Sequence, residues 1–244
     1  MSVTEVLFRP LLAGDRARPL ITHYDDTAGS RVELSVATVA NWAAKAANWL
    51  TDELDVTPGA PVAVLLPAHW QTAGVLLGAW WCGAHVTDEP SGAKVAFLPP
   101  GGALIEAASA AQTRAVVSLH PMGADLGEPP VPGTMDYVAE SRLFGDDFPT
   151  PPQVSGDSPA LLEWTVDQAV AEAHRTADSL GLEPGARMLS TVDWTMPEGV
   201  VSCLLAVLAG NASLVQSTTV DSGLLAERRS AERTTVDLLA QPAN

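Results

Sequence analysis

The same order of predicted elements occurs twice along the chain, and this duplication constrains the fold more than any other feature. Each copy has an amphipathic helix, a Pro-Gly turn, a short apolar strand, an apolar helix and a glycine. In the first half these lie at 36–54, Pro58-Gly59, 62–66, 72–82 and Gly83. In the second half they lie at 166–180, Pro184-Gly185, 188–192, 200–209 and Gly210. The two turns are 126 residues apart and the two glycines are 127 apart, which predicts a duplicated α/β unit.

Capping residues mark where the helices begin. Ser35 precedes the first amphipathic helix, and Thr165 forms a capping box with Gln168 before its counterpart. A further box, Ser2 with Glu5, predicts an N-terminal helix.

More strands and helices are predicted outside the two copies. The strands lie at 95–98, 115–118, 213–216 and 234–239, and the helices lie at 104–112 and after Thr219. Because strands alternate with helices, the expected fold class is α/β, with mainly parallel sheets flanked by helices. The expected division is a first subdomain at 1–128, a Pro-rich acidic connector at 129–159 and a second subdomain at 160–244.

The charge balance argues against nucleic acid as a partner. The chain has 13 Lys and Arg against 29 Asp and Glu, a formal net charge of −16. Its only lysines, Lys45 and Lys94, are far apart in sequence, so no basic stripe is available for a phosphate backbone.

Neither a membrane span nor a secretion signal is expected. The longest apolar stretch, 73–84, is well short of the roughly 20 residues that cross a bilayer. The N-terminus has no cationic start or cleavage site, so a cytoplasmic protein is predicted. Cys82 and Cys203 each lie in an apolar run, which favours small buried side chains over a disulfide or a metal pair.

Two stretches resemble the large domain of adenylate-forming enzymes, the superfamily of acyl-CoA synthetases, nonribosomal-peptide adenylation domains and luciferases. One stretch is 20–87, with LITHYDD and VTPGAPVAVLLPAHWQTAGVLLGAWWCGAHVT, and the other is 180–216, LGLEPGARMLSTVDWTMPEGVVSCLLAVLAGNASLVQ. In detail the chain is most similar to a short actinobacterial family of AMP-binding-like proteins with no assigned activity. The resemblance implies the two pseudo-repeated subdomains of that large domain, in truncated form.

The resemblance also implies where ATP would bind. These enzymes attach a carboxylate to the α-phosphate of ATP and hold the triphosphate in a Ser/Thr/Gly-rich loop that ends in Pro-Lys-Gly. The corresponding stretch here has the centre Ser155, Gly156, Asp157, Ser158 and Pro159. It has one glycine, no lysine and an aspartate, which at about 4 Å and an effective dielectric near 20 repels a phosphate charge by roughly 4 kcal/mol. The family's nucleotide and magnesium motifs, and its C-terminal domain with the catalytic lysine, would lie beyond Asn244. No catalytic residue is therefore assigned, and no cofactor is predicted.

The expected function is that of a noncatalytic homologue, a pseudoenzyme that serves as a small-molecule-binding, regulatory or assembly module. The alternative is a residual carboxylate-activating ligase that needs a partner domain and uses ATP or AMP with Mg²⁺. A third hypothesis is a structural role, in which a homo-oligomer or a partner protein covers the truncated face.

Other sites have less support from the sequence. His120, Asp125 and Trp194 are a second candidate ligand site, because His120 and Asp125 follow a predicted strand. The run His23 to Asp26 is interpreted as a solvated turn, and the tryptophans as core and rim packing. No Gly-x-Ser-x-Gly, Gly-x-Gly-x-x-Gly or Gly-Lys-Ser/Thr motif occurs, and no metal site is predicted.

Overall fold

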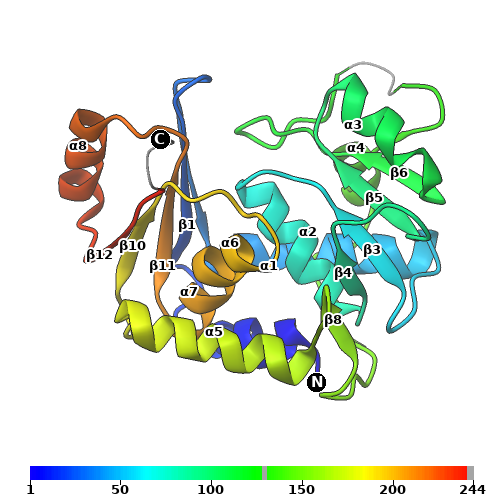
Figure 1. The fold of residues 1–244 in the computed structure, drawn as a ribbon, viewed down its shortest axis with the longest axis horizontal. Coiled ribbons are helices and arrows are strands. Elements are labelled where there is room, and N and C mark those ends of the chain that lie inside the picture. The colour runs from blue at the N-terminus through cyan, green and yellow to red at the C-terminus, as the bar shows by residue number, and fades with distance from the viewer. Residues whose placement is uncertain (128–130, 241–244) are drawn as a thin grey trace.

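The structure of the protein, a computed structural model, describes residues 1–127 and 131–240. The predicted boundary between residues 128 and 129 lies outside the described residues. Two β-sheets stand on either side of a helical layer (Figure 1), and helices α2 (Trp70–Trp81) and α7 (Ala206–Ala209) lie between them.

The sheets have five and seven strands. The five-stranded sheet has the order β12 (Val236–Leu238), β10 (Arg187–Ser190), β11 (Ser213–Ser217), β1 (Pro19–Asp25) and β2 (Ser30–Ser35). The seven-stranded sheet has the order β7 (Met135–Asp136), β6 (Thr113–Val116), β5 (Val95–Leu98), β3 (Pro61–Val64), β4 (His85–Thr87), β8 (Pro159–Leu161) and β9 (Trp164–Thr165). Among the described strands, only the pairs β1–β2 and β8–β9 are antiparallel. The predicted α/β class with mainly parallel sheets is therefore confirmed.

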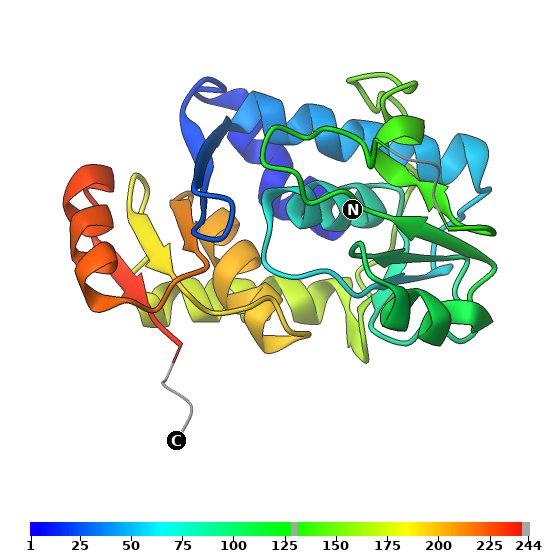
Figure 2. The same ribbon diagram turned by 90° about the horizontal axis from the view of Figure 1, so that it is seen from above.

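The other helices surround these sheets. They are η1 (Thr4–Phe8), η2 (Arg9–Ala13), α1 (Val36–Asn48) with η3 (Trp49–Glu53), α3 (Gly102–Ala107) with η4 (Ala108–Ala110), α4 (Tyr137–Ser141), α5 (Val166–Leu180), α6 (Glu198–Val200) with η5 (Val201–Leu205), and α8 (Ser222–Glu232). Helix α1 packs on α2, and α5 packs on α7. Seen from above, α1 and α5 run along opposite sides of the molecule (Figure 2).

The predicted caps are present. The Thr165 hydroxyl accepts from the backbone N–H of Gln168 at 3.3 Å, and the Gln168 side chain accepts from the N–H of Thr165 at 2.9 Å. Ser35 accepts from the N–H of Thr38 at 3.2 Å. Ser2 donates its N–H to the Glu5 carboxylate at 3.1 Å, so each of the three predicted helix starts is confirmed.

The predicted repeat is confirmed in its order of elements, with one correction. Gly59 donates its N–H to the Gly83 carbonyl at 2.8 Å, and Gly185 makes the equivalent bond to Asn211 at 3.2 Å. The counterpart of Gly83 is therefore Asn211, and the predicted match with Gly210 is wrong by one residue. Gly83 and Asn211 both have positive φ, at 82° and 52°. Asparagine is among the few residues with a side chain that tolerate this conformation.

The two halves exchange hairpins. Strand β1 pairs with β11 from the second half, and β8 pairs with β4 from the first half, both in parallel. The order β12-β10-β11-β1-β2 thus matches the order β5-β3-β4-β8-β9 strand for strand. Each sheet consequently contains strands from both 1–128 and 160–244.

Aromatic side chains fill the core of the seven-stranded sheet. Trp49, Phe97 and Tyr137 are mutually packed, with ring centroids 5.3 to 5.9 Å apart. Most of the tryptophans are buried, as the packing interpretation expects. Cys82 and Cys203 are buried and free, and burial raises the pKa of these thiols to about 12 and about 11. Among the described residues, no helix is long and apolar enough to span a membrane, and no cluster of metal-ligating side chains occurs.

Candidate functional site

The phosphate-loop position is a tight turn at the start of β8. Within residues 155–158, the N–H of Ser158 is donated to the Ser155 carbonyl at 3.1 Å, and the N–H of Asp157 contacts the Ser155 hydroxyl at 3.5 Å. The Gly156 carbonyl accepts from the N–H of Asp167, the second residue of α5, at 3.0 Å. The backbone N–H groups of Ser158 and Asp167 are therefore already used by carbonyl groups of the turn.

Two carboxylates border this turn. Asp157 is exposed on it, and the Asp167 carboxylate lies so close to Gly156 that a Cβ added to the glycine would be 2.2 Å from Oδ2. A side chain at position 156 would therefore require the exposed Asp167 side chain to move. No Lys or Arg side chain of the described residues bonds to either aspartate, so the local field opposes an anion.

A small pocket lies at the carboxyl edge of the five-stranded sheet. It has a volume of about 210 Å³ and is lined by Pro67, Ala68, Thr191, Asp193, Gln216, Ser217 and Thr218. These residues follow or end β3, β10 and β11, and the carboxyl edge of parallel strands is where open α/β folds place ligands.

Asp193 and Gln216 set the polar character of this carboxyl-edge pocket. The Asp193 carboxylate accepts from the backbone N–H groups of Ala68 and Trp194, both at 2.8 Å. The Gln216 side chain accepts from the indole N–H of Trp194 at 3.2 Å and donates to the Val192 carbonyl at 3.1 Å. These bonds hold both side chains in fixed positions at the edge of the pocket.

Two buried histidines lie beside the pocket. The rings of His23 and His69 are 4.5 Å apart, and His23 Nε2 is 3.3 Å from the Ala68 carbonyl. Burial lowers the pKa of His23, and burial together with His23 lowers that of His69 to about 3, so both rings are neutral at pH 7. His23 Nδ1 and His69 Nε2 are buried without a partner among the described residues.

The interpretation of His23 to Asp26 as a solvated turn is wrong for His23. Residues 19–25 form β1, which lies between β2 and β11 and therefore buries the His23 ring, 2% exposed. Because the second half of this strand is His23, Tyr24 and Asp25, it lacks the apolar pattern by which a buried strand is predicted from sequence.

The three residues of the second candidate site lie on different elements. His120 and Asp125 belong to the loop after β6, where His120 Nδ1 accepts from the N–H of Met122 and Asp125 lies 3.9 Å from Arg142. Trp194 is buried beside Gln216, after β10. No hydrogen bond, ion pair or ring contact among the described residues joins the three.

The residues around Trp194 were missed by sequence reasoning. Asp193 directly follows the predicted strand at 188–192, and Gln216 ends another predicted strand. Because ligands bind beyond strand ends in open α/β sheets, each residue could have been singled out as a candidate. That the two lie in one pocket depends on β10 and β11 being neighbouring strands, which the sequence does not show.

The fold is that of adenylate-forming enzymes. The structure superposes on an acyl-CoA synthetase from Brucella canis with a TM-score of 0.79 at 16% identity, over 98% of this chain and 47% of that one. An acetoacetyl-CoA synthetase from Streptomyces lividans gives 0.74 at 19% identity, over 96% and 41%. An anthranilate CoA ligase in complex with anthranoyl-AMP gives 0.73 at 17%, over 94% and 48%. The chain spans less than half the length of each of these chains.

A relative of similar length places the chain in a family. No family model matches the sequence. The chain is 41% identical over 239 residues to a TIGR03089 family protein of Mycobacterium tuberculosis, covering 96% of this chain and 97% of the relative. The protein therefore belongs to the TIGR03089 family, and the predicted resemblance to adenylate-forming enzymes and to an actinobacterial family is confirmed.

Proposed function

We propose that the protein is a noncatalytic member of the adenylate-forming fold, which binds a small molecule without activating it with ATP. The observation that carries this proposal is the turn at residues 155–158. It has Asp157 and the adjacent Asp167 where the family's phosphate loop would need glycines and a lysine.

Electrostatics at this turn disfavours a triphosphate. Each unit charge about 4 Å from a carboxylate is repelled by roughly 4 kcal/mol at an effective dielectric near 20. With two carboxylates and a polyanion this cost applies to several pairs of charges, and the backbone N–H of Ser158 is unavailable because it bonds within the turn. A divalent cation would offset part of the repulsion, but the turn itself supplies no cationic side chain.

The carboxyl-edge pocket is the place proposed for the ligand. Its volume of about 210 Å³ is below the 300 to 1,000 Å³ typical of drug-sized ligands, so a compact polar molecule fits it best. The Asp193 carboxylate would recognise a hydrogen-bond donor through Oδ2, because both of its bonds within the described residues are made by Oδ1.

The alternative is a residual carboxylate-activating ligase, which would use ATP or AMP and Mg²⁺ and require a partner domain. The likeness of the fold to the CoA ligases favours it. The chain could equally act as an assembly module, with a second copy or another protein as its partner.

ATP–pyrophosphate exchange across a panel of carboxylic acids separates these functions. We expect no exchange by the purified protein, either alone or with a separately purified lysine-bearing C-terminal domain of a CoA ligase. Robust exchange by the protein alone would contradict the proposal, and exchange restored by the added domain would establish the ligase instead.

A charge-reversal variant tests directly whether the two aspartates at the turn prevent ATP binding. The combination Asp157→Lys with Asp167→Asn should raise the affinity for Mg·ATP by at least about tenfold, because it replaces two negative charges with one positive charge. Asp178→Lys makes a similar change at an exposed position on α5 and should leave the affinity unaltered. Equal affinities of the wild type, the double variant and Asp178→Lys for Mg·ATP would show that the charge at the turn does not determine nucleotide binding.

A further inference from the structure

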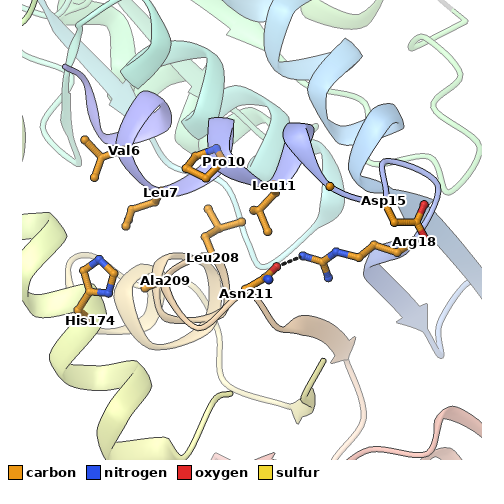
Figure 3. A pocket seen from close by; sticks show the side chains of 11 residues that line it. Val6, Leu7, Pro10, Leu11, Asp15, Arg18, His174, Leu208, Ala209 and Asn211 are labelled. Carbon is orange, nitrogen blue, oxygen red and sulfur yellow. Dashed lines mark hydrogen bonds between the residues drawn. The ribbon is translucent and has the colours of Figure 1, made fainter. Parts of the chain in front are cut away.

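A second cavity lies at the opposite, amino edge of the five-stranded sheet. It has a volume of about 410 Å³ and lies between the N-terminal turns η1 and η2 and the helices α5 and α7 (Figure 3). Leu7, Leu11 and Leu208 form an apolar wall, while Asp15, Arg18 and Asn211 lie at one end. The cavity is thus amphipathic, and its size is within the range of small-ligand sites.

Arg18 is the cation of this cavity. It donates to the Asn211 side chain at 2.6 Å and to the Ala212 carbonyl at 3.2 Å. A guanidinium has five N–H donors, so three remain. Within the described residues no carboxylate forms an ion pair with Arg18. Arg18 is half-buried, and this burial lowers its pKa while the nearby Asp15 raises it.

The loop that holds Arg18 is the repeat counterpart of the phosphate-loop turn. Arg18 donates its N–H to the Asp15 carbonyl at 3.4 Å, as Ser158 does to Ser155 at 3.1 Å. In both halves the first two residues of the following helix donate their backbone N–H groups to carbonyl groups of this turn. The bonds are Val36 to Arg18 and Ala37 to Arg16 in the first half, and Val166 to Ser158 and Asp167 to Gly156 in the second. The same turn therefore occurs twice, with a guanidinium in the first copy where the second copy has Ser158.

We propose that this amino-edge cavity binds a small amphipathic carboxylate, with its head group at Arg18 and Asn211 and its apolar tail along Leu7, Leu11 and Leu208. A guanidinium pairs with a carboxylate through parallel hydrogen bonds, and the leucines give the other end of the cavity an apolar lining. One arginine beside Asp15 suits a single negative charge rather than a polyphosphate. The site is independent of the proposed function, since it is at the other edge of the sheet.

Calorimetric titration with octanoate is the test, with octanol and octylammonium as probes of head-group charge. Octanoate should bind the wild-type protein at least about tenfold more tightly than octanol, and octylammonium should not bind. Arg18→Gln should weaken octanoate binding by about tenfold or more. Arg16→Gln removes the same charge from an exposed position two residues away and should have no effect.

Two further variants keep the inference testable if Arg18→Gln fails to fold. Ala209→Phe leaves Arg18 intact and fills the cavity, so it should abolish binding. Asp15→Asn removes the repelling charge and should tighten binding. Octanoate affinity that is unchanged in Ala209→Phe, or lost in Asp193→Asn at the carboxyl-edge pocket, would overturn the assignment, as would equal binding of octanoate and octanol.

Discussion

Glu232 at the end of α8 connects three elements through charged hydrogen bonds. Its carboxylate accepts from the Tyr24 hydroxyl at 2.5 Å and from Arg31 at 2.7 Å, and it also pairs with Arg187. Burial alone would raise the pKa of Glu232, but the hydrogen bonds from Arg31, Tyr24 and Arg187 outweigh it and lower the pKa to about 2. The ionised form therefore holds α8 against the five-stranded sheet.

Glu232→Gln should lower the free energy of unfolding at pH 7 by about 1.5 to 3 kcal/mol, because a charged acceptor is lost. The folded pKa is below the ordinary value of 4.5, so this stabilisation is complete above about pH 4.5 and is lost as pH falls toward 2. Urea denaturation at pH 7 and pH 3 should show the gap between wild type and variant narrowing at the lower pH.

Glu227→Gln, on the exposed face of the same helix, is the matched control and should change stability by less than about 0.5 kcal/mol. A gap for Glu232→Gln that is equally large at pH 7 and pH 3 would show that its carboxylate does not stabilise the fold through its charge.

At the scale of elements, the crossing of α1 and α2 depends on one glycine. A Cβ added to Gly78 would lie 2.4 Å from the Ala46 Cβ and 2.7 Å from the Ala43 carbonyl. The backbones of α1 and α2 therefore approach so closely at this crossing that even a methyl group at position 78 does not fit between them.

Gly78→Ala should destabilise the protein by about 1 to 3 kcal/mol, since the clash outweighs the roughly 1 kcal/mol that alanine gains over glycine in a helix. Gly102→Ala introduces the same methyl group into open space near the start of α3, and it should be neutral or slightly stabilising. Thermal denaturation of both variants measures the difference. Equal melting temperatures would mean that the helices can separate without cost.

Elements with strong local patterns could be predicted from sequence. The apolar runs of β3, β5, β10 and β11 and the capped starts of α1 and α5 were all predictable. The hairpins were not, because β1 contains His23 and Tyr24, while β8 and β9 have only three and two residues. Strand β6 lies at 113–116 rather than 115–118 because its register is set by pairing with β5.

At the scale of the whole molecule, the exchanged hairpins make each sheet depend on both halves of the chain. Such interleaving predicts one cooperative unfolding transition rather than one per half. Differential scanning calorimetry should give a single peak, with calorimetric and van't Hoff enthalpies in agreement. Two separate peaks would show that the halves unfold as independent units.

The candidate sites were only partly predictable from the sequence, because some of their contacts join the two halves of the chain. The chemistry at residues 155–158 is local, so the sequence alone indicates an acidic turn. Asp193 beside Ala68 and Arg18 beside Asn211 each join residues from opposite halves of the chain, and the second pair meets because β1 and β11 are neighbouring strands. No spacing along the sequence records these contacts.

Calorimetric titration of the purified protein with ATP, with and without Mg²⁺, tests most directly whether the acidic turn excludes a triphosphate. The predicted result is no saturable heat, corresponding to a dissociation constant above about 1 mM. Micromolar binding that requires Mg²⁺ would contradict the account.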